Sequence, residues 1–408
     1  MASAWAEAAR NDAEQKLAAL PALTGEEEEW RFTEPAALGL DGGDVAAPGA
    51  SGAAGALGEG GRAARLALVD GAAGTVDAQG LPDGVIVTEL GEALASHEDL
   101  VRPHLGSLVG TDTRPGALNA ARWDAGLFVY VPRGAAVELP IEALLTATGA
   151  AGRVYGRTLV VLEEGAKATV IDRCLSPDLG GTVQASTVTE LVVGPGAELE
   201  HITIIGWGSG VHHHATLAAS AAKDSRVRSV VVSLGGDVVR VEPTMFCRGQ
   251  GADARALGLF FADGDQHFEH RVVSRHEAPA AYSNLLYKGA LKDTARTVFF
   301  GNLVVPPGAP GTDAYQTNRN LVLNEGASAE TIPFLEIETA EVKCSHAGAV
   351  GRVDDEHLFY LRSRGVPEAE AKQLVVLGFL QEVLEEVRLE ELRHELEAAV
   401  ARKLGVQA

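Results

Sequence analysis

The sequence has little that would stabilise an extracellular or membrane-embedded chain. Its three cysteines, Cys174, Cys247 and Cys344, are too few and too widely spaced for a disulfide framework. No apolar run approaches the roughly eighteen residues needed to cross a bilayer, and the N-terminus has no basic region typical of targeting signals. We therefore expect a protein of the reducing cytoplasm without membrane contact.

Basic clusters and common catalytic motifs are also missing. The formal net charge is −22 and no local cluster of Lys and Arg offsets it, so a phosphate polymer would be repelled and we expect no nucleic-acid partner. The chain contains no Gly-Lys dipeptide, which excludes a Walker loop, and no Gly-x-Ser-x-Gly nucleophile elbow. Any use of ATP must therefore come from a partner.

What is present suggests more than one compact unit. The chain has 408 residues, 46% of them apolar, which is enough for two or three cores. Residues 3–20 have apolar positions near helical spacing, and residues 90–109 suggest one or two further helices. Gly and Ala dominate residues 39–64, a composition typical of a linker. We predict that residues 1–110 form an N-terminal helical region containing this linker.

A repeat dominates the middle of the chain. A Gly-Ala step, or a degenerate copy of it, precedes a strand-like run at Gly134, Gly165, Gly196, Asp224, Gly251, Asp293 and Gly326. The first five starts are 31, 31, 28 and 27 residues apart, and such self-similarity indicates a repeat architecture. The units are rich in Val, Thr and Ile, which excludes helical solenoids. We predict a mainly β fold with a right-handed parallel β-helix over residues 111–352, flanked by N-terminal and C-terminal helical segments.

Residues 353–408 are predicted to form a C-terminal helical domain. Apolar residues fall at helical intervals in two runs after Pro367, one from Val376 to Val387 and one from Leu389 to Val400. These two stripes predict amphipathic helices. They could pack against the β-helix as a cap, or they could dock on another protein.

Cys344 and His346 are the strongest candidate site residues. They alternate with Lys343 and Ser345, so an extended strand turns the thiol and the imidazole to the same face. Thiolate and imidazole nitrogen are the usual protein donors to iron or zinc. Two donors do not fill a tetrahedron, so a partner chain or labile ligands must supply the rest. The alternative is a buried thiol and a hydrogen-bonded imidazole at a domain junction.

Other histidines form two further groups. His212 and His214 share one face of a predicted strand, but nothing nearby supplies a third ligand. His267, His270 and His276 lie close to Glu269 and Asp265, and in a β-helix they could form either a metal site or, as we favour, stacked polar ladders. We interpret Cys174 and Cys247 as thiols of the core.

Several motifs together resemble the SufB/SufD family of iron-sulfur cluster assembly scaffolds, and SufD most of all. The signature Val-Lys-Cys-Ser-His ends at His346, and Asp-Asp-Glu-His-Leu-Phe-Tyr-Leu-Arg-Ser-Arg-Gly-Val follows from Asp354. Further similar stretches are Leu118-Asn-Ala120, Asp124 to Gly134, His267-Phe-Glu-His270, Thr312 to Leu321 and the acidic and aromatic segment around Trp30. Family members usually read Cys-Ser-His-Gly-Ala-Thr, whereas this chain reads Cys-Ser-His-Ala-Gly-Ala from Cys344.

The resemblance implies the same β-helical fold and a specific role. It implies a non-enzymatic, SufD-type scaffold subunit of a SufBCD complex that builds nascent iron-sulfur clusters and passes them to apoproteins. The expected partners are a SufB-like paralogue and a SufC-like ATPase, which would engage the C-terminal helices and hydrolyse the ATP. His346 is implied as a contact to iron or a transient cluster at the subunit interface, with Cys344 as the adjacent thiol; a flavin in the complex is left open. The alternatives are a SufB-like homodimer and a β-helical enzyme acting on polysaccharide, although no carboxylate or Lys/Arg constellation typical of the latter is evident.

Overall fold

From β5 onward, successive strands alternate between two sheets in the computed structural model, which describes residues 4–40 and 60–405. One sheet is ordered β2 (Ala72–Ala73), β1 (Ala64–Val69), β6 (Ile141–Thr146), β8 (Lys167–Leu175), β10 (Glu198–Gly206), β12 (Arg226–Ser233), β14 (Asp253–Ala262), β16 (Tyr282–Leu291), β18 (Asp313–Val322) and β20 (Lys343–Arg352), with β3 (Asp77–Ala78) beside β1. The other is ordered β19 (Ser328–Ile337), β17 (Arg296–Val305), β15 (His267–His276), β13 (Val238–Cys247), β11 (Val211–Ala221), β9 (Val183–Val193), β7 (Arg153–Leu162), β5 (Ala125–Val131) and β4 (Ile86–Glu89).

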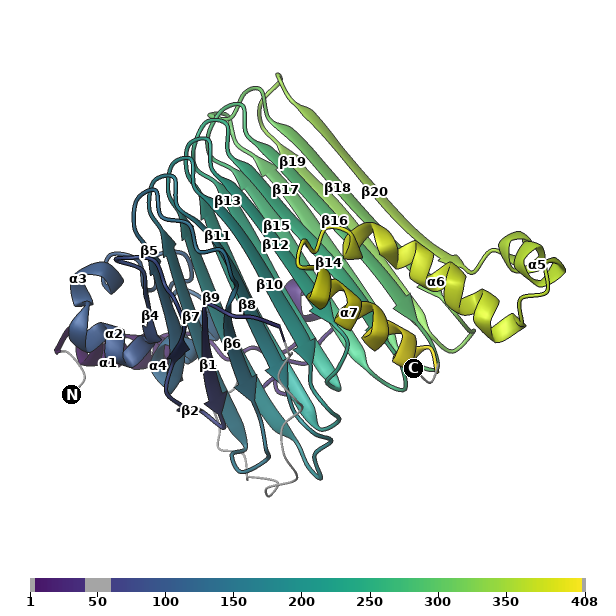
Figure 1. Cartoon of the computed structure of the whole chain (residues 1–408), viewed down its shortest axis with the longest axis horizontal. Helices are drawn as coiled ribbons and strands as arrows, with labels where there is room; N and C mark the ends of the chain where they lie inside the picture. Colours follow the sequence, from purple (N-terminus) through teal and green to yellow (C-terminus); the bar gives the residue numbers. More distant parts are fainter. Residues whose placement is uncertain (1–3, 41–59, 406–408) are drawn as a thin grey trace.

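Every pairing among β5 to β20 is parallel, so one strand from each sheet makes one coil and the coils stack along the molecule (Figure 1). This confirms the predicted mainly β fold with a parallel β-helix flanked by helices.

The predicted Gly-Ala steps form a column of turns along one corner of the β-helix. Residues in the left-handed region stack there in the order Gly134, Gly165, Gly196, Asp224, Gly251, Ala280 and Gly311. Their backbone N–H groups link adjacent coils, as where Gly165 donates to the carbonyl of Pro195 at 2.9 Å. A positive φ favours Gly or Asp at such a turn, which explains the recurring sequence signal.

Two of the predicted repeat starts lie at the opposite corner. Asp293 follows β16 and Gly326 follows β18, whereas the main column follows β5, β7, β9, β11 and β13. Both corners require tight turns, so Asp or Gly before a strand occurs at both. The repeat was therefore identified correctly, and its seven predicted starts are divided between the two corners, five in the main column and two at the opposite corner.

The lumen between the sheets is filled mainly by apolar side chains. Alternate residues of each strand point inward, and this cluster runs from Leu127 and Val160 near one end to Phe260, Tyr287 and Phe299 near the other. Apolar burial stabilises a fold by about 25 cal/mol per Å². The stacked coils therefore share one continuous core.

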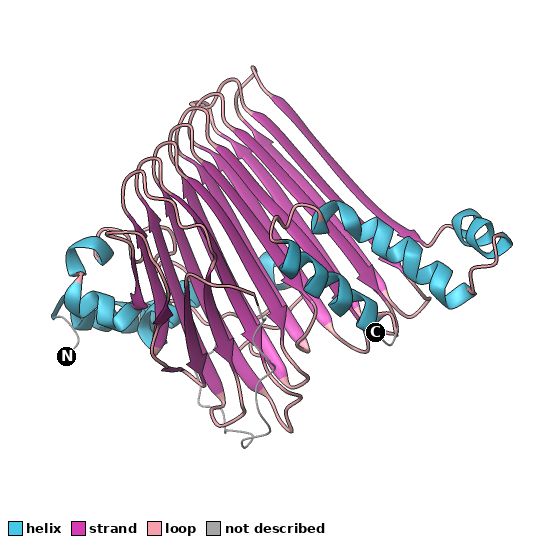
Figure 2. Cartoon of the chain, in the orientation of Figure 1, coloured by secondary structure: helices cyan, strands magenta, loops and turns pink. Residues whose placement is uncertain are grey.

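Helices cover the outer faces of both sheets (Figure 2). Four helices pack on the sheet that contains β5 and β7, near its N-terminal end: α1 (Ala4–Ala19), α2 (Leu90–Ser96), α3 (Glu98–Val101) and α4 (Arg114–Arg122). Helices α6 (Glu368–Leu384) and α7 (Glu390–Lys403) pack on the other sheet, which contains β10 and β14. Leu380 and Leu396 of these helices join Ile202 and Leu257 in one apolar cluster. The apolar stripes of these two helices therefore face the side of the β-helix and do not cap its end.

Helix α5 (Asp355–Ser363) differs from the other C-terminal helices. It projects beyond β20 (Figure 1), and none of its residues is buried. Phe359 and Tyr360 on this helix are 73% and 58% exposed, which leaves an aromatic surface next to the last coil.

Several boundaries differ from simple sequence expectations. Strands β1 to β4 lie before residue 110, so the sheets begin upstream of residue 111, and the division into three domains stays a prediction. Most of the predicted Gly/Ala-rich linker, residues 41–59, lies outside the described residues. Within the part of the chain that the structure describes, no helix combines the length and the apolar character needed to span a membrane.

Candidate functional site

Cys344 and His346 lie on β20, the last strand of its sheet. In the parallel register Cys344 is opposite Ala314, and His346 is opposite Gln316. Ala314 belongs to the core between the sheets, and the Gln316 Nε2 atom donates to the carbonyl of Gly301 in β17 at 3.2 Å. The same face of β20 therefore looks into the lumen, and strand geometry places the two Cα atoms about 6.6 Å apart.

The site is open because the β-helix ends there. Among residues 4–40 and 60–405, no strand pairs with the outer edges of β19 and β20. Cys344 is consequently half-buried and His346 is exposed, although their positions in earlier coils are sealed. Neither side chain is enclosed within the monomer, so the alternative of a thiol and an imidazole buried at a domain junction does not describe this site.

The charge state of the thiol follows from its position. Partial burial raises the pKa of Cys344, and the negative charge of Asp313 raises it further. The thiol is therefore protonated near neutral pH, and a soft cation would have to displace that proton to be bound by the thiolate.

The residues that the structure describes hold no complete set of metal ligands in one copy of the chain. In the described part of the chain, no group of three or more His, Cys, Asp and Glu side chains is arranged to hold a metal ion. Cys344 and His346 suit iron by donor type, but they fit as one half of a site. The remaining ligands would have to come from outside this monomer.

The lumen becomes polar just below this open end. Gln316, Asn318 and Asn320 on β18 are buried, whereas the residues opposite them in β16 are Leu285, Tyr287 and Gly289. The carbonyl oxygens of the Gln316 and Asn320 side chains have no hydrogen-bond partner. Buried polar atoms normally have partners, so these two oxygens are unsatisfied acceptors beside the open end.

Exposed apolar residues surround the same end. Phe334 and Ile337 on β19 and Val350 on β20 are 45%, 38% and 45% exposed. Together with Phe359 and Tyr360 of α5 they form what we term the open-end surface. A strand edge flanked by exposed apolar residues favours pairing with another chain.

The chain departs from the family signature just after His346, and the structure shows why glycine is needed there. A Cβ atom on Gly348 would lie 2.9 Å from the Thr331 Oγ1 atom of β19. The glycine therefore permits the two last strands to approach closely, even though it stands one position later than in the usual signature.

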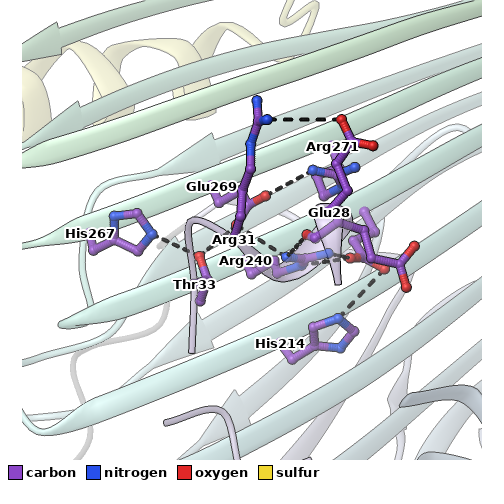
Figure 3. A network of polar contacts seen from close by, with 10 residues as sticks. Glu28, Arg31, Thr33, His214, Arg240, His267, Glu269 and Arg271 are labelled. Atoms are coloured by element: carbon purple, nitrogen blue, oxygen red, sulfur yellow. Dashed lines mark hydrogen bonds and ion pairs between the residues drawn. The ribbon is translucent and has the colours of Figure 1, made fainter. Parts of the chain in front are cut away.

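The outer-face histidines contact the N-terminal segment (Figure 3). Trp30, in a short 3-10 helix (Glu28–Trp30), lies 3.6 Å from the Arg240 guanidinium carbon and 6.0 Å from the His214 ring, measured from the ring centroid. Thr33 bonds to Glu269 at 2.5 Å and to the His267 ring at 2.7 Å. This contact network was not foreseen, because it joins segments far apart in the sequence.

We favoured stacked polar ladders for the group of His267, His270, His276, Glu269 and Asp265; of this group, Glu269 joins a polar ladder on the outer face, whereas His270 and His276 are buried elsewhere. His214, Arg240 and Glu269 are neighbours across β11, β13 and β15, and Arg240 pairs with Glu269 at 3.2 Å. His212 contributes at the next position by bonding to the carbonyl of Ala37 at 2.9 Å. These side chains therefore fasten residues 30–37 to the sheet.

The remaining histidines and cysteines of interest lie within the lumen. His270 bonds to the Ser233 hydroxyl at 3.0 Å and stacks on Phe260, and burial lowers its pKa to about 3. His276 bonds to the Ser283 hydroxyl at 2.8 Å. Cys174 and Cys247 are buried, and burial raises the pKa of Cys247 to about 12, so both behave as core thiols as predicted.

Family models and relatives match most of the chain. Residues 145–379 match the model of the SufBD core domain of SUF system FeS cluster assembly, and residues 68–143 match the SufBD protein N-terminal region. An iron-sulfur cluster assembly SufBD family protein of Mycobacterium tuberculosis is 41% identical over 313 residues, covering 74% of this chain and 77% of the relative. A SufBD family protein of Mycobacterium leprae is 38% identical over 302 residues, covering 72% and 76%. SufB of Bacillus subtilis is 27% identical over 308 residues, covering 75% of this chain and 66% of that protein.

Proposed function

The chain belongs to the SufBD family of iron-sulfur cluster assembly proteins, and from this premise we propose that it is a SufD-type scaffold subunit of the cytoplasm. In this role it pairs with a SufB-like paralogue and recruits a SufC-like ATPase. The nascent cluster is cargo that is built on the complex and passed to apoproteins. Family membership also replaces the alternative of a polysaccharide-active enzyme.

The observation that carries the proposal is the open end of the β-helix. It presents Cys344 and His346 on one lumenal face of an unpaired edge strand. A paralogue that docks on the open-end surface would supply the missing ligands and cover the exposed apolar residues. Imidazole and thiolate would then hold iron or a forming cluster from this side of the interface.

A second surface suits the ATPase. The apolar stripes of α6 and α7 are buried against the β-helix, so those side chains are not free for a partner. Helix α5 and the outward face of α6, where Leu374 is 47% exposed, remain accessible. We infer that the ATPase binds this part of the C-terminal helices, and that it alone hydrolyses ATP.

The cargo site is tested by replacing His346 with Ala. Wild type and His346→Ala are co-expressed anaerobically with the paralogue and the ATPase, and iron and sulfide are measured on the purified complex. We expect iron and sulfide to fall severalfold while the complex still assembles. His394→Ala is the matched control, because His394 is an exposed histidine on α7, outside the open-end surface and outside the part of α5 and α6 proposed to bind the ATPase. Unchanged iron and sulfide in His346→Ala would refute the role of this imidazole. The absorbance of the same preparation reports whether a flavin is present.

A homodimeric scaffold is the second candidate function, favoured by the similarity to SufB of Bacillus subtilis. Two copies joined at the open end would bring two Cys344 and two His346 side chains together. The mass of the purified chain, measured with and without the paralogue, distinguishes the two assemblies. A homodimer that persists in the presence of an excess of paralogue would contradict the heteromeric proposal.

A further inference from the structure

A groove of about 360 Å³ lies on the outer face of the sheet that contains β8, β10, β12 and β14. Residues near the start of these four strands line it, together with Arg388 from the connection between α6 and α7. In this sheet β16 and β18 separate β14 from β20, so the groove is away from the open end. Its volume is that of small-molecule sites.

The fold gathers positive charge here that no single stretch of the sequence contains. Among the described residues, five cations line the groove: Lys167, Arg226, Arg228, Arg255 and Arg388. The carboxylates that line it are Glu198, Glu200 and Asp253, and a fourth, that of Glu386, pairs with Arg228 at 3.3 Å. One positive charge is therefore in excess at this place in a chain whose net charge is −22.

The first residues of the four strands alternate in sign. Lys167, Glu198, Arg226 and Asp253 are neighbours in the parallel register. Glu198 pairs with Lys167 at 3.0 Å and with Arg226 at 3.4 Å. Opposite charges on adjacent strands attract one another, so this row is balanced without a further ion.

The row of residues two positions further along the strands contains adjacent like charges. Glu200, Arg228 and Arg255 are neighbours there, and the strands that carry the two arginines are about 4.8 Å apart. Burial lowers the pKa of Arg228, and the positive charges of Arg388 and Arg255 lower it further, while Glu386 and Glu200 oppose this effect. Like charges on adjacent strands are destabilising, so an anion between the guanidiniums would relieve their repulsion.

Both guanidiniums keep donors for such an anion. Arg255 donates to Asp253 through Nε and Nη2, at 2.9 and 3.0 Å, which leaves Nη1. Arg228 uses Nη1 to contact the carbonyl and the carboxylate of Glu386, which leaves Nε and Nη2. The two side chains are 32% and 16% exposed, and their remaining donors are not among the buried atoms without partners. A ligand in the groove can therefore reach them, and planar guanidinium donors suit phosphate oxygens.

The groove also offers acceptors for hydroxyl groups. Glu200 accepts from the backbone N–H of Arg388 through Oε1 at 3.2 Å, which leaves its other oxygen, and Thr169 adds a hydroxyl. None of the described residues that line the groove is aromatic, so a nucleotide base would have no ring on which to stack. These groups favour a ligand whose uncharged part carries hydroxyl groups.

We propose that this groove binds a small phosphate monoester whose organic part carries hydroxyl groups. The phosphate lies between the guanidiniums of Arg228 and Arg255, near Arg388, and the hydroxyl groups donate to Glu200 and Thr169. The site is independent of Cys344 and His346, so its existence does not depend on the role proposed for the open end.

The competing explanation is a charged surface that attracts every anion weakly. Attraction of that kind depends on charge alone and is weakened by salt. Inorganic sulfate and a phosphate monoester both carry about two negative charges near pH 7.5, but sulfate has no hydroxyl group. A preference for the ester over sulfate therefore separates a built site from general attraction.

The experiment is calorimetric titration of the full chain, in about 0.15 M salt, with glucose 6-phosphate, glucose and sodium sulfate. We expect one saturable site for glucose 6-phosphate, with affinity at least about tenfold higher than for either other probe. Arg255→Gln removes one guanidinium and should lower this affinity about tenfold. Arg275→Gln is the matched control, because Arg275 on β15 also pairs with a carboxylate two residues away on its chain, at 3.1 Å, but lies on the other sheet.

A second variant changes a side chain that is not needed for folding of the sheet. Arg388→Glu reverses an exposed charge on the connection between α6 and α7 and should lower the affinity at least about tenfold. Arg402→Glu is its control, since Arg402 is an exposed arginine of α7 that does not line the groove.

Three results would each overturn the proposal: equal affinities for glucose 6-phosphate and sulfate, absence of saturable binding, or binding that survives both Arg255→Gln and Arg388→Glu. A loss in Arg402→Glu as large as in Arg388→Glu would also overturn it, because net charge alone would then explain the binding.

Discussion

The two ends of the β-helix are built differently. At the N-terminal end β4 pairs antiparallel with β5, and β2 and β3 pair antiparallel with β1, while four helices cover the adjoining face. At the other end β19 and β20 have free edges within the described chain, and α5 projects away from them. The first end, which we term the closed end, is covered by helices and antiparallel strands of the chain itself, whereas β19 and β20 at the second end are followed by no further strand in the described residues.

This difference explains why the chemistry-bearing residues lie where they do. Wherever another coil stacks on a coil, the side chains that point into the lumen are buried. A thiol at such a position is inert, as at Cys174 and Cys247. The same lumenal position on the last coil is accessible. Cys344 and His346 are therefore accessible because no further coil stacks on β20 in the described chain, and no special loop or cleft is needed to expose them.

The largest expected effect is on stability at the closed end. Leu127 on β5 is 0% exposed, so Leu127→Ala should lower the free energy of unfolding of the isolated chain by about 3 kcal/mol. Leu335→Ala on β19 should cost about 1 kcal/mol, because Leu335 is half-buried at the open end. Chemical denaturation measures both, and equal losses would show that the two ends are equally well packed.

The second largest effect is expected on association of this chain with the paralogue or with a second copy. Val350→Lys places a charge on the open-end surface and should weaken binding to the paralogue, or to a second copy, by at least about tenfold. Val69→Lys is the matched control, because Val69 on β1 is 42% exposed and Val350 is 45% exposed. Sedimentation velocity gives both affinities. If Val69→Lys weakened association as strongly, the open end would not be the specific interface.

A smaller effect is expected on the pH dependence of the free energy of unfolding. Here a histidine in the sealed lumen, His270, is compared with a histidine on the projecting helix α5. Burial lowers the pKa of His270 to about 3 from 6.5, so below pH 6.5 the unfolded chain binds a proton that the folded chain does not. The free energy of unfolding should fall as pH falls from about 6.5, by up to about 1.4 kcal/mol per pH unit from this residue.

His270→Phe should reduce that slope, and His357→Phe on α5 should leave it unchanged because His357 is exposed. Denaturation at several pH values between 7 and 4 measures the slope for each variant. An identical slope in wild type and His270→Phe would contradict the assignment to this lumenal imidazole.

The smallest effect is a difference in thiol reactivity. In the native chain, iodoacetamide should modify Cys344 while the buried Cys174 and Cys247 react after unfolding. Because partial burial and the charge of Asp313 raise the pKa of Cys344, its rate should increase about tenfold per pH unit through the neutral and mildly alkaline range. Peptide mass spectrometry identifies the modified residue, and early labelling of Cys174 would contradict a sealed lumen.

Local signals in the sequence predicted the architecture well. Asp or Gly occupies the left-handed turn in most coils, and this recurrence was sufficient to predict a parallel β-helix. Strand alternation also placed Cys344 and His346 on one face, which the register with Ala314 and Gln316 supports. These features depend on neighbouring residues along the chain.

Features that depend on distant contacts could not be predicted in the same way. Alternation does not reveal whether another coil covers β20, so the exposure of its lumenal face was not predictable. The contact of Arg240 with the carbonyl of Glu29 joins residues 211 positions apart. Helix α5 lacks a buried stripe, and so its exact bounds had no periodic signal. The apolar stripes of α6 and α7 predicted helices but did not reveal which surface would cover them.

The column of turns has a consequence for how this fold can change during evolution. Coils along it differ in length by a few residues, while most of the central strands have ten or eleven residues, so the variation is absorbed at the corners. Each corner hydrogen bond requires one left-handed backbone position, and the residues beside it are free to vary in number. Short insertions and deletions at a corner should leave the lumen intact, and gain or loss of a whole coil would move the open end by one strand spacing, about 4.8 Å, without redesign of the core.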